Sequence, residues 1–192
     1  MDNKITDGKV RCSWVTADPL YIAYHDQEWG VPCHDDQKLF EMLLLEGLQA
    51  GLSWITVLRK RERYRQVTGD FCAEKLAAWS NEDIAAALQD KGLIRNRRKM
   101  EALRQNARAF LALQQRCDVV EWLWQFTGGT TLQNHWESGM GIPAATEESH
   151  SMSRELKRAG FTFVGPTICY AFMQAVGMVN DHAEDCFLRL QF

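Results

Sequence analysis

Two cysteines and two histidines near the ends of the chain have the side chains needed to bind a metal ion. His182 and Cys186 are four residues apart, so on a helix they would lie on one face. Cys12 and His25 offer the same two ligand types near the other end. Two thiolates and two imidazoles form a tetrahedral set that suits Zn²⁺ and leaves no position for a catalytic water. The spacing matches no ordinary zinc finger, so the residues alone leave two interpretations: a structural zinc site or a chance grouping.

Aromatic residues are dense in the segment between Cys12 and His25. Trp14, Tyr21 and Tyr24 are interleaved there with polar residues and an Asp-Pro pair. Such a group either forms a flat slot that stacks a planar ligand or anchors an irregular N-terminal segment onto helices.

Glu46 follows three leucines, at 43–45, in a run that predicts a buried helix. A carboxylate in an apolar run is usually exposed at an edge or paired, but an unpaired buried one is costly and often functional. Shortly afterwards Gly51 and Leu52 predict a tight turn with an exposed apolar tip, and Trp54 supplies another ring. These residues extend the candidate pocket.

Positive charge is local rather than general. The chain has 22 basic and 25 acidic residues, a formal net charge of −3, so it has no overall cationic field for nucleic acid. Basic residues gather in two clusters, Arg59–Arg65 and Arg95–Lys99. A charged run is most often a solvated helix face. Both clusters also lie near predicted helix starts, where phosphates can meet backbone N–H groups.

Length and composition indicate an ordinary globular domain. The chain has 192 residues, 46% hydrophobic and 24% charged, which excludes a disordered or fibrous protein. The six cysteines are scattered, no secretory signal opens the chain, and no apolar run is long enough to span a membrane. We therefore expect a cytoplasmic protein with reduced thiols and no membrane contact.

An all-α fold is predicted to position these residues. The chain has only four prolines, and apolar residues recur every three to four positions. Between residues 127 and 151 the composition shifts toward Gly, Thr, Glu and Ser, which predicts a long loop. Helices are expected over residues 38–48, from 54 with Ser53 as its cap, from 81, over 97–115 with Asn96 as its cap, over 152–159 and over 167–176.

Seven motifs, taken in chain order, resemble those of the DNA-3-methyladenine glycosylase I family. The resemblance extends from Arg11 to Cys186, and it implies an all-α helix–hairpin–helix DNA glycosylase fold whose ends are joined by zinc. It implies a single domain over residues 11–192, a flexible extension over 1–10, and the helix–hairpin–helix at about 153–180. The matching segments are Arg11–Trp14, Asp18–Asp26, Glu28–Pro32, Leu45–Gly47, Gln49–Ile55, Gly160–Gly165 and Val179–His182.

The resemblance also implies a role for each group of residues. The expected partners are double-stranded alkylated DNA and the 3-methyladenine base, bound by a monomer. Leu52 is a candidate wedge for the vacated base stack. The implied structural zinc ligands are Cys12, His25, His182 and Cys186; the base-binding residues are Trp14, Tyr21, Tyr24, Glu46 and Trp54; the DNA contacts are Gly51, Leu52, Phe163, Val164, Gly165 and Thr167.

The chemistry of such a lesion requires little acid catalysis. A base methylated at N3 carries positive charge and departs neutral, so the enzyme must flip the nucleotide and bind the base. Rings at Trp14, Tyr24 and Trp54 would each contribute about 0.5–2 kcal/mol of cation–π attraction. Glu46 would accept hydrogen bonds from the amino edge and favour the cation over neutral adenine, as the principal catalytic-site residue.

The general base is not identified by the resemblance. Many helix–hairpin–helix glycosylases place a catalytic Asp where this chain has Asn180, and Asp181 is a neighbour rather than a match. Two other classes of protein remain open. One is a zinc-stabilised module that binds damaged DNA or another planar ligand without catalysis. The other is a metal-dependent hydrolase, which would need an open coordination position.

Overall fold

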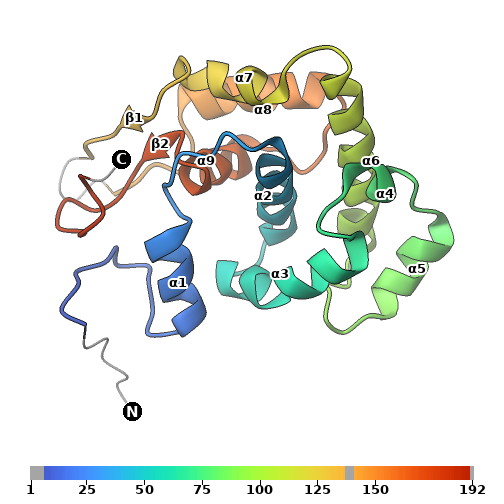
Figure 1. Ribbon diagram of the computed structural model, residues 1–192, viewed down its shortest axis with the longest axis horizontal. Coiled ribbons are helices and arrows are strands. Elements are labelled where there is room, and N and C mark those ends of the chain that lie inside the picture. The colour runs from blue at the N-terminus through green and yellow to red at the C-terminus, as the bar shows by residue number, and fades with distance from the viewer. Residues whose placement is uncertain (1–6, 137–140, 191–192) are drawn as a thin grey trace.

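Helix α2 (Asp36–Gln49) lies at the centre of the molecule, and ten consecutive residues of it, Leu39–Leu48, are buried. It is enclosed because α3, α6, α7 and α9 all pack against it. The computed structural model describes residues 7–136 and 141–190, and Figure 1 shows the other helices arranged around α2. They are α1 (Pro19–Gln27), α3 (Trp54–Thr68), α4 (Ala73–Ala77), α5 (Asn81–Gln89), α6 (Arg97–Gln114), α7 (Val119–Trp124), the 3₁₀ turn η1 (Gln125–Thr127), α8 (Glu147–Arg158) and α9 (Pro166–Ala175).

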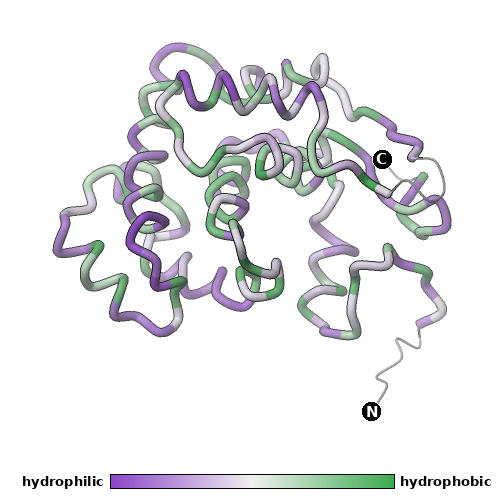
Figure 2. Tube along the Cα trace, turned by 180° about the vertical axis from the view of Figure 1, so that it is seen from behind, coloured by the Kyte–Doolittle hydropathy of each residue, from purple (hydrophilic) through white to green (hydrophobic). Residues whose placement is uncertain are grey.

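The mostly helical fold confirms the coarse prediction, with one small addition. Strands β1 (Leu132–Gln133) and β2 (Val179–Asn180) form a two-residue parallel pair, in which Leu132 is opposite Val179. In Figure 2 the peripheral helices carry hydrophilic colour, whereas α9, at the centre, is largely white and green. The core therefore lies around the α2–α9 pair. No helix in the described part of the chain is long and apolar enough to cross a membrane.

Helix α8 shows where the predicted loop over 127–151 was wrong. The helix begins at Glu147, inside that loop, because Thr146 and Ser149 form a reciprocal capping box. Helix α1 was not predicted, since its apolar and polar residues do not separate onto two faces. A signal was present nevertheless: Asp18 caps the helix by accepting a hydrogen bond from the backbone N–H of Leu20, and Pro19 occupies the first turn.

The two ends of the described chain lie side by side. The backbone N–H of Phe187 donates to the carbonyl of Val10, and the Lys9 ammonium lies 4.5 Å from the centre of the Phe187 ring. Residues 7–10, expected to belong to a flexible extension over 1–10, are therefore bound to the domain. Residues 1–6 of that expected extension lie outside the described residues.

Candidate functional site

The fold brings the four predicted metal ligands together although 170 residues separate Cys12 from His182. One ligand atom from each lies within 4.8 Å of all the others, and all four residues are buried. The Cys186 sulfur is 3.5 Å from Nε2 of His25 and 3.5 Å from Nδ1 of His182, and the Cys12 sulfur is 3.6 Å from Nδ1 of His182. These separations fit ligands at the corners of a tetrahedron around one Zn²⁺ ion.

The surroundings of these ligands suit a cation. Nδ1 of His25 is 2.8 Å from the Asp26 carboxylate, which also binds Arg11. A carboxylate in this position orients a ligating imidazole. Burial raises the pKa of the Cys12 thiol to about 12 and lowers the pKa of His182 to about 4. The imidazole is thus neutral, as a ligand must be, and the thiol needs a nearby positive charge in order to ionise.

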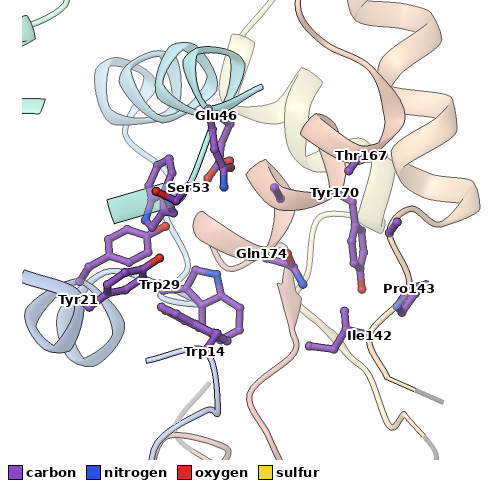
Figure 3. Close-up of a pocket in the computed structure, with 15 residues that line it drawn as sticks. Trp14, Tyr21, Trp29, Glu46, Ser53, Ile142, Pro143, Thr167, Tyr170 and Gln174 are labelled. Atoms are coloured by element: carbon purple, nitrogen blue, oxygen red, sulfur yellow. The ribbon is translucent and has the colours of Figure 1, made fainter. Parts of the chain in front are cut away.

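A pocket of about 430 Å³ opens beside this cluster and contains all five predicted base-binding residues. Figure 3 shows Glu46 descending from α2 between two walls, with Trp14 and Tyr21 on one side and Tyr170 opposite them. The aromatic prediction therefore identified one wall. Besides the five predicted residues, the pocket is lined by Trp29, Gln49, Ser53, Ile142, Pro143, Ala144, Thr167, Tyr170, Ala171 and Gln174.

Glu46 is only 3% exposed at the inner end of the pocket. Burial raises the pKa of its carboxyl group to about 8. Among the described residues, the Glu46 Oε2 atom, the Tyr24 hydroxyl and the Trp54 indole nitrogen have no hydrogen-bond partner. Buried polar atoms without partners are rare, and each normally has a reason. Three of them in one pocket indicate a polar ligand that supplies the missing partners.

The rings of the pocket form a connected aromatic group. Tyr24 and Trp54 have ring centres 5.2 Å apart, and Trp14 lies 5.6 Å from Tyr21. Trp29 joins this group to the metal cluster, because its ring is 5.1 Å from that of Trp14 and 4.7 Å from that of His182. The ligand cluster therefore supports the wall of the pocket.

Asp181 fixes the opposite wall and was not predicted to do so. It is 3% exposed and accepts four hydrogen bonds. Two come from pocket residues, the Tyr170 hydroxyl at 2.6 Å and Nε2 of Gln174 at 2.8 Å. The others come from Asn134 at 2.7 Å and Trp136 at 2.9 Å. Asn134 and Trp136 are more than 40 residues from Asp181 in the sequence, so the sequence carried no signal for this network.

The residues predicted to contact DNA lie on two adjacent segments near the pocket. Gly51 and Leu52 form the turn between α2 and α3, where Leu52 is 40% exposed. The second segment precedes α9, where Gly165 is the N-cap and makes no side-chain capping bond. Val164 in this segment is 1% exposed, so its side chain belongs to the core. The predicted contact of Val164 with DNA would therefore be made by its backbone. Thr167 lines the pocket itself.

Helix α9 presents unbonded backbone donors at its N-terminus. The first N–H groups of a helix have no partner inside it, and Pro166 in the first turn supplies none. Phe163, just before the helix, has a φ of 54°, in the left-handed region that residues other than glycine rarely adopt. This local geometry can direct N–H groups toward an anion.

The two basic clusters have different surroundings. In the Arg59–Arg65 cluster every arginine is paired: Arg59 with Asp18 at 2.6 Å, Arg63 with Asp90 at 2.7 Å, and both Arg61 and Arg65 with Glu41. This cluster is therefore an ion-paired helix face, which agrees with the usual interpretation of a charged run, and its contact with DNA stays a prediction. In the second cluster three arginines are exposed, Arg95, Arg97 and Arg98, whereas Lys99 is buried.

The fold and the pocket together define a DNA glycosylase, as two solved structures indicate. The crystal structure of 3-methyladenine DNA glycosylase I has a TM-score of 0.90 and 51% identity, covering 93% of this chain and 98% of that one. A tyrosine-to-phenylalanine variant of 3-methyladenine DNA glycosylase I, solved in complex with 3-methyladenine, has a TM-score of 0.89 and 32% identity, covering 93% and 97%.

Sequence comparison gives the family. The family model for methyladenine glycosylase matches residues 14–189. DNA-3-methyladenine glycosylase 1 of Escherichia coli (strain K12) is 51% identical over 177 residues, which are 92% of this chain and 95% of that protein. The chain belongs to the methyladenine glycosylase family.

Proposed function

We propose that this protein flips 3-methyladenine out of alkylated double-stranded DNA and hydrolyses its N-glycosyl bond, leaving an abasic site for base excision repair. The observation that carries the proposal is the buried, unpartnered carboxylate of Glu46 at the end of an aromatic pocket. A relative with the same fold has been solved with 3-methyladenine bound, which supports the choice of base.

The pocket suits a cationic purine better than a neutral one. Burial raises the pKa of the Glu46 carboxyl group to about 8, which favours its neutral form at pH 7. A methylated base carries a delocalised positive charge, which lowers that pKa and favours the carboxylate. The carboxylate then accepts hydrogen bonds from the amino edge of the base, while the faces of Tyr24 and Trp54 attract the cation. Neutral adenine has the same amino edge, but it gains neither the charge attraction of the carboxylate nor the cation–π attraction of the rings.

Bond cleavage follows from this binding. The C1′–N bond breaks, its electron pair goes to the base, and the base leaves neutral because it already carried the positive charge. Water adds to C1′ and loses a proton to the solvent. Asp181 is poorly placed to accept that proton, because four donors already occupy its oxygens. The Glu46 carboxylate stabilises the charge of the bound lesion.

Contacts to DNA are proposed for the two segments beside the pocket. The unit formed by α8, residues 159–165 and α9 is the proposed helix–hairpin–helix, with backbone N–H groups near Gly165 and Thr167 facing a phosphate. Leu52, exposed at the α2–α3 turn, is the proposed wedge. The exposed arginines at the start of α6 supply local positive charge. That the protein acts as a cytoplasmic monomer stays a prediction.

A structural zinc ion is proposed for Cys12, His25, His182 and Cys186. When bound, zinc would join the two chain ends and would leave no coordination position for substrate, since all four ligands are protein side chains. Two observations support this assignment: all four residues are buried, and their ligand atoms lie within 4.8 Å of one another. Absorption spectroscopy of the cobalt-substituted protein tests it, because a four-coordinate site with two thiolates has intense visible bands. A spectrum of an octahedral, oxygen-rich site would contradict it.

Incubation with methylated duplex DNA, followed by chromatography of the released bases, tests the catalytic proposal. The expected product is free 3-methyladenine together with an abasic strand that alkali cleaves. A protein that bound the same DNA but released no base would instead be a binding module. Parallel measurement of 3-methylguanine defines the substrate range.

A further inference from the structure

The C-terminal end of α2 is held by a side chain from another helix. The last carbonyl groups of a helix have no partner inside it, and α2 has no basic residue in its own last turn. The ammonium of Lys99, on α6, donates to the carbonyls of Leu48 and Ala50, each at 2.7 Å. A cation at this end of a helix also interacts favourably with the helix dipole.

Lys99 is unusual because it is almost completely buried. It is 6% exposed, whereas Arg97 and Arg98 beside it are exposed. Burial lowers the pKa of its ammonium group, which shows that the position opposes the charge. Lysine is seldom buried unless it is paired. The two carbonyls at the start of the Gly51–Leu52 turn are the described groups that compensate for this burial.

Two helical turns further along α6, Asn106 holds the segment before α9. Its Nδ2 donates to the carbonyl of Thr162 at 3.0 Å, and its Oδ1 accepts the Thr162 backbone N–H at 2.8 Å. Asn106 is 2% exposed. One side-chain amide thus bonds both backbone groups of a single residue, next to Phe163 and its left-handed backbone.

The segment before α9 also packs against the last turn of α2, next to the carbonyls that Lys99 holds. A methyl group added at Gly47 of α2 would lie 3.4 Å from Cβ and 3.4 Å from the carbonyl oxygen of Phe163. The space between α2, α6 and this segment is only about 10 Å³, and it is lined by Gly47, Lys99, Asn106 and Phe163 among others. Helix α6 therefore sets the separation of two segments that meet along one packed seam.

We propose that α6 is a template that fixes the α2–α3 turn relative to the segment before α9, and that Lys99 is the positioning residue for the turn. This inference rests on the proposed function, in which the turn carries the wedge and the other segment holds a phosphate. Filling the vacated stack requires the wedge at one particular step from the bound phosphate. Lys99 acts on DNA through Leu52 and makes no contact with DNA itself, since it is buried beneath the turn.

The test compares Lys99→Met with the parent in three measurements. The first is kcat/KM for excision from methylated duplex, which we expect to fall at least tenfold. The second is affinity for free 3-methyladenine, measured by quenching of tryptophan fluorescence, which we expect to stay within twofold. The third is the salt dependence of DNA binding, which we expect to be unchanged because no phosphate contact is lost. The exposed Lys75→Met is the matched control for loss of one lysine charge, and it should equal the parent.

Each outcome decides between the proposal and its alternatives. Duplex excision at the parental rate would overturn it, and so would an equal loss of free-base affinity, since Lys99 would then support the whole fold. A smaller salt dependence would make Lys99 a direct phosphate contact and would overturn it too. If Lys99→Met does not fold, Lys99→Gln, which keeps an N–H donor group without the charge, is judged by the same three measurements. Failure of the proposed function is distinct, because the parent itself would then release no base.

Discussion

At the scale of single residues, the proposed function depends on a carboxyl group that is buried without a partner. Glu46 is recognisable in the sequence, because it interrupts a leucine run in what is otherwise a buried helix. Its lack of a partner and its raised pKa depend on elements that close around α2, and the sequence could not show them. Asp181 is the opposite case, because it is buried and accepts hydrogen bonds from four side chains. The sequence could not show this network, since the four donors come from two separate regions of the chain.

Glu46→Gln is expected to raise stability at alkaline pH. The carboxyl pKa is about 4.5 when unfolded and about 8 when folded, so the folded protein binds the extra proton between these values. Stability of the parent therefore falls as pH rises through this window, by about 1.4 kcal/mol per pH unit. Urea unfolding at pH 5 and pH 8 measures this change in the free energy of unfolding. The variant should lose less stability than the parent between the two, and an equal loss in both would contradict the burial of an unpartnered carboxyl.

Asp181→Asn is expected to destabilise the protein and disturb the pocket. An amide accepts at one atom only and places its NH₂ group against existing donors, so about two hydrogen bonds to a charged group are lost. The expected cost is about 3–6 kcal/mol in urea unfolding. Asp185→Asn, at an exposed position, is the control. Unchanged stability in Asp181→Asn would show that Tyr170 and Gln174 do not depend on this carboxylate.

At the scale of elements, the sequence was informative where a helix has a clear period or cap. The predicted starts at Asn81 and Arg97 agree with α5 and α6, and Asn96 caps α6 by accepting from the N–H of Lys99. Ser53 stands at the N-cap of α3, but its hydroxyl bonds to Thr56 instead of capping the backbone. The ion pairs of the basic cluster on α3 could not be predicted, because its acidic partners lie just before α1, in α2 and just after α5.

The two basic clusters are expected to differ in their effect on DNA binding. Arg98→Gln removes an exposed charge at the start of α6, so affinity should fall and the slope of log K against log salt should decrease by about 1. Arg63→Gln removes an arginine already paired with Asp90, so both quantities should change little. Binding to duplex DNA across a salt series measures both. Equal slopes for the two variants would contradict the view that the α6 arginines offer free charge to DNA and the paired α3 arginines do not.

At the scale of the whole molecule, the chain ends are joined to the pocket through the ligand cluster. The set of ligand types could be proposed from sequence, but their meeting depends on packing of the two ends, including the bond from Phe187 to Val10. The helical class was predictable from periodicity. The enclosure of α2 by four other helices was not, because it arises from contacts between distant segments.

Removal of the proposed zinc ion is expected to loosen both chain ends together. Without a cation, four buried ligands lose the interaction that holds them, so Cys186→Ser or chelation should lower the melting temperature by several degrees or more. Hydrogen exchange should increase at residues 10–18 and 181–189 before it increases in α2. Cys72→Ser, at a site far from the cluster in sequence, is the control. Loss of metal with no change in melting temperature would contradict a structural role.

The most direct test of the central claim is the rate of 3-methyladenine release by Glu46→Gln. The amide keeps the shape of the side chain but removes the charge that attracts the cationic base. Loss of a charged hydrogen bond of about 1.5–3 kcal/mol corresponds to a ten- to hundredfold lower kcat/KM on methylated duplex DNA. The exposed Glu82→Gln should match the parent. We predict that Glu46→Gln folds and shows this loss; a folded Glu46→Gln that releases 3-methyladenine as fast as the parent would contradict the account.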